Sequence, residues 1–327
     1  MGAGLTRFCA PYPGSVSAVQ ALEGVRPRAP RTLHHAAYPA ARIAAERELS
    51  VSLCLPAKDE AATIGPILES LMPLVERGAV DQVVVLDDST DGTGDIAGRI
   101  GAEVHIQSDL MADFGPVRGK GDAMWRALAV ATGDVVCFLD ADSERFGEHF
   151  ACGLVGPITC EPHVAFVKGY YERPFRLGTG AEMPEGGGRV TELMARPLLN
   201  LFYPQLSGFL QPLAGEIAAR RELLLSVPFM TGYGVDVALL IDVWRRQGAE
   251  RLAQVDLEVR QNQHKRLSDL VPMAEAVLGA VLRRAQEEGR LTLAEHEELS
   301  LPFAHGESLV NVRTEERPPF EALGAGI

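Results

Sequence analysis

Short apolar runs alternate with amphipathic stretches through the first half of the chain. Apolar or β-branched runs at residues 53–55, 82–86, 103–106 and 134–139 predict buried strands. Between them, apolar residues at helical spacing predict helices over residues 61–76, 94–100 and 121–132. Strands that alternate with helices indicate an α/β fold with a mainly parallel sheet and right-handed crossovers. The loops after Leu55, Leu86 and Leu139 should therefore open on one edge of that sheet.

The second half continues with an amphipathic helix predicted over residues 237–246, a strand over 252–259 and one or two helices over 267–288. Residues 1–48 are rich in Pro, Ala and Arg and predict a loosely ordered arm, with a short helix around residues 40–46. Several prolines after about residue 299 predict a tail.

Two carboxylates follow the apolar run at residues 134–139. Asp140 and Asp142 should stand at the rim of a crevice, because ligands of open α/β sheets gather beyond the carboxyl ends of the strands. Hard carboxylate oxygens there suit Mg²⁺ or Mn²⁺, which commonly hold a nucleotide diphosphate. The alternative is that Asp140 caps a turn and Asp142 is solvated. A second acidic turn covers residues 87–93, in which at least one of Asp87, Asp88 and Asp91 is expected only to cap the backbone.

A glycine-rich segment at residues 186–192 has the composition of an anion site. Its glycines let backbone N–H groups approach a ligand, Arg189 can fork onto a phosphate or carboxylate, and Thr191 adds a hydroxyl at the start of a predicted helix. A small, highly charged acid would suit this segment. The alternative is a flexible linker with a solvated Arg189. Glycines and acids over residues 178–188 also suggest a mobile lid.

Composition narrows the function further. The 327-residue chain carries a formal net charge of −13, which argues against nucleic acid as a partner and requires a local basic pocket for any anionic substrate. Arg118, Lys120, Arg189 and the run at residues 260–266 are the candidates. Five cysteines without C-x-x-C spacing favour a reduced, cytoplasmic location. The sequence offers neither a signal-peptide core nor a window of about 18 apolar residues, which predicts no membrane association.

Three acidic turns, taken in their order along the chain, resemble those of a known family. The segments Pro56–Glu60, Asp87–Thr93 and Asp140–Asp142 resemble the nucleotide-diphospho-sugar transferases of the GT-A type. Residues 186–199, 211–216 and 232–236 resemble, more narrowly, the glucosyl-3-phosphoglycerate synthases and their mannosyl counterparts. The resemblance covers residues 49–270. It implies a GT-A sheet flanked by helices, with a C-terminal helical part.

The resemblance also implies the division of the chain and its activity. Residues 49–145 would be the nucleotide-sugar-binding half and 146–266 the acceptor-binding half of one domain, followed by C-terminal helices and tail at 267–327. The implied enzyme is a metal-dependent, retaining hexosyltransferase that moves mannose from GDP-mannose to the 2-hydroxyl of 3-phosphoglycerate, which gives a compatible-solute precursor. The alternative donor is UDP- or GDP-glucose. A non-catalytic nucleotide-sugar-binding regulator is the rival from another class, and relatives suggest a homodimer.

Site residues follow from the resemblance. Asp140, Asp142 and Asp236 would serve catalysis. The nucleotide sugar would contact Pro56, Ala57, Lys58, Glu60, Ser89, Lys120, Asp140, Ala141, Leu213, Ala214, Gly215, Tyr233, Asp236 and Arg260. The acceptor would contact Gly188, Arg189, Val190, Thr191, Asn262 and Lys265.

The metal ligands are expected to be Asp142 and His264. In the related synthases, the segment that resembles residues 260–266 contains a His metal ligand and an Asn near the acceptor, in the opposite order to Asn262 and His264 here. Asn262 is therefore the alternative metal ligand, through its carbonyl oxygen. A neutral imidazole is the better ligand for Mg²⁺ or Mn²⁺ than an amide, which favours His264.

Overall fold

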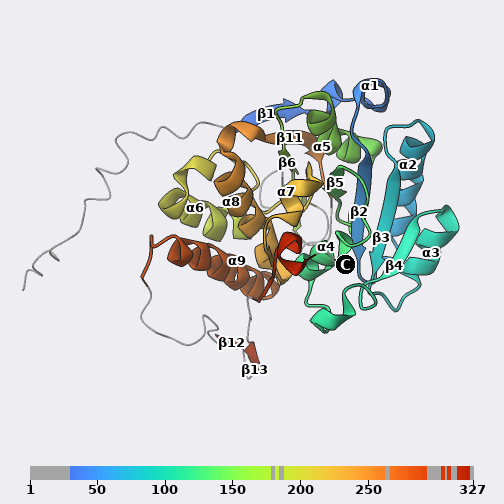
Figure 1. The fold of residues 1–327 in the computed structure, drawn as a ribbon. Helices are drawn as coiled ribbons and strands as arrows, with labels where there is room; N and C mark the ends of the chain where they lie inside the picture. Colours follow the sequence, from blue (N-terminus) through green and yellow to red (C-terminus); the bar gives the residue numbers. More distant parts are fainter. Residues whose placement is uncertain are drawn as a thin grey trace, which may run out of the picture.

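An eight-stranded sheet runs through the centre of the computed structural model, which describes residues 30–177, 181–183, 188–261, 266–292, 303–305, 308–310 and 315–324 (Figure 1). The strand order is β1-β11-β6-β9-β5-β2-β3-β4, and only β9 runs antiparallel to its two neighbours. The strands are β1 Arg31–His34, β2 Val51–Ala57, β3 Gln82–Asp87, β4 Glu103–Ile106, β5 Val135–Phe138, β6 Phe166–Glu172, β9 Ile217–Arg220 and β11 Leu252–Val259. The prediction of a mainly parallel sheet is confirmed.

Helices cover both faces of this sheet, because successive side chains of each strand point to opposite sides. On β2, Leu53 and Leu55 pack into one buried cluster and Cys54 into the other. The first cluster includes side chains of α1 Ala40–Glu46, α2 Ile64–Glu76, α3 Thr93–Ile100 and α5 Glu148–Cys160. The second includes side chains of α4 Lys120–Ala127, α6 Arg196–Phe202, α7 Arg221–Leu225, α8 Val235–Gln247 and α9 Leu267–Glu287.

Short elements complete the described chain. The single-turn segments are η1 His35–Ala37, η2 Ala112–Phe114, η4 Pro204–Leu206, η5 Gly232–Gly234, η6 Ala249–Arg251 and η7 Phe320–Leu323, and η3 Thr191–Ala195 is a π-helix that leads into α6. Three two-stranded sheets pair β7 Phe175–Leu177 with β8 Ala181–Met183, β10 Phe229–Met230 with β14 Glu316–Arg317, and β12 Phe303–His305 with β13 Ser308–Val310.

The amino-terminal part of the fold begins earlier than the sequence predicts. Residues 31–46, expected to belong to an arm, form the edge strand β1 and helix α1. Side chains of Leu33, Ala40 and Ile43 join the first buried cluster, so this segment is an integral part of the sheet. The short helix predicted around residues 40–46 is confirmed.

The carboxyl-terminal segment also differs from the predicted tail. Residues 315–324 pack on α4: Arg317 Nε lies 2.7 Å from Asp122 Oδ1, and the Trp125 indole N–H donates to the carbonyl of Pro318 at 2.8 Å. The Thr231 N–H donates to the carbonyl of Glu315 at 2.8 Å. The buried pair between Arg317 and Asp122 joins residues 195 positions apart, which no local sequence pattern announces.

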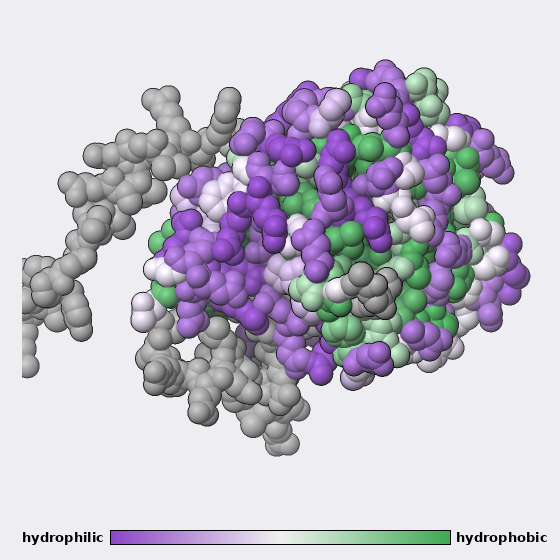
Figure 2. Space-filling model, in the orientation of Figure 1, coloured by the Kyte–Doolittle hydropathy of each residue, from purple (hydrophilic) through white to green (hydrophobic). Residues whose placement is uncertain are grey.

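The surface in the view of Figure 2 is mostly hydrophilic, with apolar side chains gathered around the region of α4. Within the described ranges, no helix is both long and apolar enough to cross a bilayer.

Candidate active site

A cavity of about 570 Å³ opens at the sheet edge where β2, β3, β5, β6 and β11 end. Parallel strands bring their carboxyl ends to the same edge, and the antiparallel β9 brings its amino end there. The lining includes most of the predicted site residues: Pro56, Ala57, Lys58, Glu60, Lys120, Asp140, Ala141, Asp142, Gly188, Arg189, Val190, Thr191, Leu213, Gly215, Tyr233, Asp236 and Arg260.

The two carboxylates after β5 face different partners. Asp140 Oδ1 accepts a hydrogen bond from Lys120 Nζ at 2.7 Å, and its Oδ2 lies 3.0 Å from Arg260. Asp142 Oδ1 accepts from Arg260 at 2.6 Å, while its side chain remains 46% exposed. The Thr63 hydroxyl donates to the carbonyl of Ala141 at 2.6 Å and fixes the turn between them. Both carboxylate oxygens of Asp140 are therefore paired with cations. The partly exposed carboxylate of Asp142 can still bind a ligand in the cavity.

Arg260 is the centre of a buried charge cluster. It follows β11 and is 3% exposed, and its guanidinium lies 2.8 Å from Glu216 and donates to the Tyr171 hydroxyl at 2.8 Å. The Tyr171 hydroxyl in turn donates to Glu216 Oε2 at 2.7 Å. Glu216 immediately precedes β9, so the antiparallel strand in the middle of the sheet is what brings this carboxylate to the site.

Glycine at position 215 allows these charges to meet. A Cβ atom at Gly215 would lie 2.0 Å from Lys120 Nζ and 2.6 Å from both carboxylate oxygens of Asp140. Any side chain there would separate the lysine from its carboxylate. The family resemblance includes the segment Gln211–Glu216, and this close contact explains why position 215 is a glycine.

The cluster sets the ionisation of its members. Burial opposes the charged form of Asp140, but the cations of Lys120 and Arg260 outweigh it and hold the pKa of Asp140 well below its usual range. Burial likewise opposes the charge of Lys120, yet the carboxylates of Asp140 and Asp236 raise its pKa. Both groups are charged at neutral pH. The site thus carries fixed, paired charges before any ligand arrives.

Asp236 and Lys168 lie beneath the cluster. Burial raises the pKa of Asp236 and lowers that of Lys168 to about 8. Lys168 Nζ reaches the backbone carbonyl of Asp236 at 3.4 Å. Among the described residues, no hydrogen-bond donor reaches Asp236 Oδ1, although this atom is buried. An unpartnered buried acceptor at the cavity is suited to a ligand hydroxyl.

The turns after β2 and β3 hold one another. Lys58 Nζ lies 2.9 Å from Asp88 Oδ2, and the Ser89 hydroxyl accepts from the Asp59 N–H at 2.8 Å. Asp91 accepts from the backbone N–H groups of Ala61 and Thr93 at 3.0 and 3.1 Å. Asp91 is thus a capping residue, as expected for at least one of these acids.

A second carboxylate, that of Glu60, lines the cavity together with Asp142. Burial, and next the charge of Asp142, raise the pKa of Glu60. This repulsion would be relieved by a divalent cation, and oxygen ligands suit Mg²⁺ or Mn²⁺. The residues present here therefore fit a metal of the predicted class. The second expected ligand, His264, and its alternative Asn262 lie outside the described residues, as does Lys265.

The predicted acceptor segment lies on the wall of the same cavity. Gly188 adopts a left-handed φ of +73°, which glycine accommodates without steric cost, and the chain then turns into helix at Arg189 and Val190. Thr191 is buried at the start of η3. The helix start expected here is confirmed. Part of the expected lid, residues 178–180 and 184–187, lies outside the described ranges.

Of the predicted site residues that the structure describes, two do not line this cavity. Ala214 is 1% exposed and belongs to the first buried cluster, and Ser89 lines a neighbouring hollow. Sequence reasoning missed further lining residues, namely Gln107, Val117, Gly119, Arg173, Gly232, Leu270 and Met273. Gly119 and Gly232 have φ of +84° and +70°, and a Cβ at Gly119 would lie 3.2 Å from the Cα of Gly232. The repeated glycines of both turns were the available signal.

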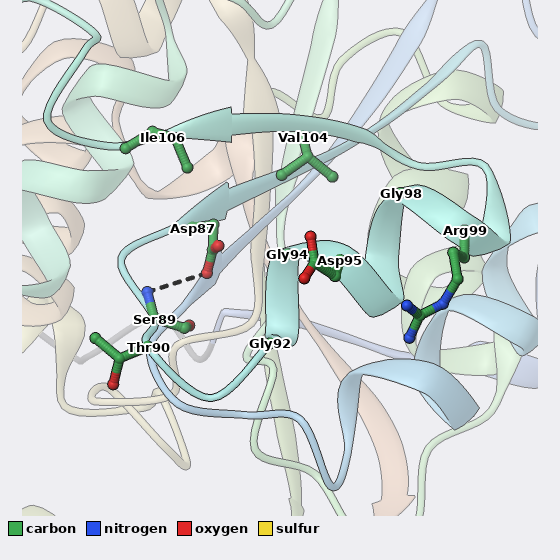
Figure 3. Close-up of a pocket in the computed structure, with 10 residues that line it drawn as sticks. All are labelled: Asp87, Ser89, Thr90, Gly92, Gly94, Asp95, Gly98, Arg99, Val104 and Ile106. Atoms are coloured by element: carbon green, nitrogen blue, oxygen red, sulfur yellow. Dashed lines mark hydrogen bonds between the residues drawn. The ribbon is translucent and has the colours of Figure 1, made fainter.

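The neighbouring hollow has a volume of about 640 Å³ and lies between the β3–α3 turn, α3 and β4 (Figure 3). Asp87, Asp95 and Arg99 contribute its charges, and the one hydrogen bond drawn there runs from the Ser89 N–H to Asp87 at 3.1 Å. Asp95 and Arg99 are exposed. No buried ion pair between described residues lines this hollow, in contrast to the cavity.

Comparisons with known proteins agree with this geometry. Residues 52–174 match the glycosyl transferase family 2. The chain is 40% identical over 270 residues to the glucosyl-3-phosphoglycerate synthase of Petrotoga mobilis, which covers 80% of this chain and 83% of that protein. It is 45% identical over 245 residues to the synthase of the same name from Mycolicibacterium paratuberculosis, with 74% of each chain covered.

Solved structures give the same grouping. The mannosyl-3-phosphoglycerate synthase of Rubrobacter xylanophilus superposes with a TM-score of 0.80 at 43% identity, over 90% of this chain and 97% of that one. The glucosyl-3-phosphoglycerate synthase of Mycobacterium tuberculosis, solved with Mn²⁺, UDP-glucose and phosphoglyceric acid, superposes with a TM-score of 0.78 at 36% identity, over 90% and 99%. The chain therefore belongs to the family of the glucosyl- and mannosyl-3-phosphoglycerate synthases, which are hexosyltransferases with a GT-A-like fold.

Proposed function

We propose that this protein transfers a hexose from a nucleotide diphosphate sugar to the 2-hydroxyl of 3-phosphoglycerate, with retention at the anomeric carbon. The observation that carries the proposal is the shared cavity. It is lined by the carboxylate of Asp142 and the paired charges of Lys120, Asp140 and Arg260, and also by Arg189 and Thr191. One cavity thus contains groups suited to a metal-bound diphosphate and groups suited to a small anion.

The donor would lie along the ends of β2, β3 and β5. Pro56, Ala57 and Lys58 would flank the base and ribose, and Asp140 would keep Lys120 and Arg260 in place beneath the diphosphate. Asp142 and His264 would hold Mg²⁺ or Mn²⁺. The Mn²⁺ in the related mycobacterial structure supports a metal of this class. When bound, the metal supplies positive charge for the leaving diphosphate.

The acceptor would bind at the start of η3. Arg189 can form charge-assisted hydrogen bonds to a phosphate or carboxylate, and the turn at Gly188 brings backbone N–H groups close to the same anion. Asn262 and Lys265 are proposed to complete this subsite. A bound anion here directs its 2-hydroxyl into the cavity toward the sugar.

The sugar would sit between these two subsites. The Oδ1 of Asp236, which has no partner among the described residues, would accept a hydrogen bond from a sugar hydroxyl, and the backbone around Leu213 and Gly215 would form the floor. Retention needs no protein nucleophile when the acceptor attacks from the face of the leaving group and the leaving phosphate oxygen takes its proton. The protein's part is then to position both reactants and to stabilise the departing charge.

Two donors have specific support. Glucose is favoured by the glucosyl-3-phosphoglycerate synthases at 40–45% identity, and mannose by the mannosyl synthase that superposes at 43% identity. Our sequence-based expectation of GDP-mannose stays a prediction. A homodimer likewise stays a prediction.

A donor panel tests the proposal. Purified protein with Mg²⁺ or Mn²⁺ and 3-phosphoglycerate is incubated with GDP-mannose, GDP-glucose or UDP-glucose, and the product is identified by mass spectrometry and NMR. We expect a hexosyl group on the 2-oxygen, and no product from 2-phosphoglycerate, whose 2-oxygen is blocked. Hydrolysis of every donor without transfer to 3-phosphoglycerate would contradict the proposal.

The metal assignment has its own test. His264→Ala should weaken Mn²⁺ affinity and leave the KM for 3-phosphoglycerate less affected, because a neutral imidazole is the stronger ligand. Asn262→Ala should affect the acceptor instead. If the two variants exchange these phenotypes, Asn262 is the ligand.

A further inference from the structure

A group of two histidines and a glutamate lies beside the edge strand β1, outside the cavity described above. One potential ligand atom each from His34, His35 and Glu258 lies within 4.8 Å of the others. His34 ends β1, His35 begins η1, and Glu258 lies near the end of the adjacent strand β11. None of the three lines the cavity, and the sugar-transfer proposal uses none of them.

We propose that His34, His35 and Glu258 form a second cation site, which binds a borderline divalent metal such as Zn²⁺. Two imidazoles and one carboxylate are a common zinc ligand set, which leaves a fourth position for water. This donor set has two imidazoles, whereas the ligands proposed for Mg²⁺ or Mn²⁺ in the cavity, Asp142 and His264, include one. Nitrogen donors favour later transition metals, so the two sites should select different cations.

The spacing of the ligand atoms is close to what a metal requires. His35 Nε2 lies 2.9 Å from Glu258 Oε1. Two ligands in a tetrahedral site with bonds of about 2.0 Å are roughly 3.3 Å apart. A cation can therefore replace the shared proton between these two atoms with little movement of either side chain. His34 and Glu258 are exposed, so their side chains can adjust around the ion.

The fold holds His35 in place. Gly153 of α5 lies against it, since a Cβ atom at this glycine would come within 2.8 Å of the His35 Cβ. The His35 ring lies between the rings of His34 and His149, with centroids 4.6 and 4.8 Å away. These contacts restrict the movement of the His35 side chain.

A distortion of β11 presents Glu258 to the histidines. The register between β11 and β6 shifts between Asp256 and Val259, and Glu258 has a left-handed φ of +65°. The Glu258 N–H donates to Asp256 Oδ1 at 2.9 Å, which stabilises the bulge. A bulge re-aims a side chain at the edge of a sheet. Here it brings a carboxylate to a pair of histidines more than 220 positions away in the sequence.

The edge strand on the other side of the sheet, β4, supplies a matched control. On β4, His105 Nε2 lies 2.6 Å from Glu103 Oε1, which reproduces the pair of His35 and Glu258. No third His, Cys, Asp or Glu of the described residues completes a ligand group there. A simple His–Glu ion pair should behave alike at both edges, whereas a metal site should exist only at β1 and β11.

Zinc titration by calorimetry tests the proposal. The untagged Asp142→Asn protein, which lacks the active-site carboxylate, should bind one Zn²⁺ in the presence of excess Mg²⁺. Adding His34→Ala or Glu258→Gln should weaken this binding by at least about tenfold, the lower end of the cost of losing even an outer partner of a metal site. Adding His105→Ala should leave it unchanged. Circular dichroism and thermal melting confirm that each variant is folded.

Three results would overturn the proposal. The first is that the Asp142→Asn protein binds no Zn²⁺. The second is that Zn²⁺ affinity survives His34→Ala and Glu258→Gln together. The third is that His105→Ala weakens binding as much as Glu258→Gln. Because the readout is Zn²⁺ binding rather than sugar transfer, the outcome is independent of the proposed function.

Discussion

Two hollows of similar size lie at the same edge of the sheet, and only one has the features of an active site. The cavity at Asp140 measures about 570 Å³ and the hollow beside α3 about 640 Å³. Both follow strand ends and both contain acids, so volume and acidic residues do not separate them. The cavity is also lined by several basic side chains, whereas Arg99 is the one basic residue among the described residues that line the hollow.

The arrangement of charge separates them. In the cavity, Asp140 lies 2.7 Å from Lys120 and 3.0 Å from Arg260, and Arg260 is almost fully buried. In the hollow, Asp95 and Arg99 are exposed on α3 (Figure 3). Charges that are fixed before the ligand binds need no reorganisation during the reaction. Their interactions with the ligand are also stronger where water is excluded.

The largest effect is expected from the metal carboxylate. Asp142→Asn should lower kcat by about a thousandfold or more, because the leaving diphosphate loses its metal, while thermal stability stays close to wild type. The matched change Asp95→Asn in the hollow should leave kcat unchanged. Steady-state kinetics with Mg²⁺ and Mn²⁺ measures both. Normal turnover in Asp142→Asn would remove this residue from the mechanism.

A glycine exchange should come next. Gly215→Ala places a Cβ atom 2.0 Å from Lys120 Nζ and must part it from Asp140, so kcat/KM should fall by about a hundredfold. Gly98→Ala in α3 is the control, since its nearest neighbour is a Val104 methyl at 3.9 Å. Equal activity of the two variants would show that the paired charges do not position the donor.

A smaller effect, limited to acceptor binding, is expected at Arg189. Arg189→Ala removes a charge-assisted hydrogen bond worth about 1.5–3 kcal/mol, so the KM for 3-phosphoglycerate should rise about 10- to 150-fold. Donor affinity, measured by calorimetry with the nucleoside diphosphate, should change little. Arg99→Ala is the matched control in the hollow. A donor defect as large as the acceptor defect would refute the assignment of Arg189.

The smallest predicted effect is on stability. The pKa of Lys168 is lowered from 10.5 to about 8 by burial, so between these pH values the unfolded chain holds a proton that the folded chain has released. Stability should therefore rise with pH across this window relative to Lys168→Met, by up to roughly 3 kcal/mol. Denaturant unfolding at pH 7.5 to 10 measures it. The exposed Lys58→Met comparison should show no such rise, and a flat difference for Lys168 would mean that its charge is not penalised by burial.

The sequence was sufficient to predict the positions of those site residues that depend on neighbouring residues in the chain. Asp140 and Asp142 follow a buried strand, and parallel strands put such positions at one edge, so their place was predictable. Arg189 and Thr191 could likewise be placed at a helix start. Glu216 could not be assigned, because its role depends on the antiparallel β9 inserted between β5 and β6.

Contacts between distant segments escaped prediction for the same reason. The pair of Arg317 with Asp122 places residues 315–324 in the fold, although prolines suggested a tail. Pairing of β1 with β11 brings His34 and His35 to Glu258, although composition suggested an arm. Neither depends on a periodic pattern, and both depend on which strands become neighbours.

The most direct test is the location of the ligands. A crystal structure with Mn²⁺, the nucleoside diphosphate of the accepted donor and 3-phosphoglycerate, recorded near the manganese absorption edge, places each group. We expect an anomalous peak at Asp142 and the phosphoglycerate against Arg189 and Thr191. Manganese away from Asp142, or the nucleotide in the hollow beside Asp95 and Arg99, would contradict it.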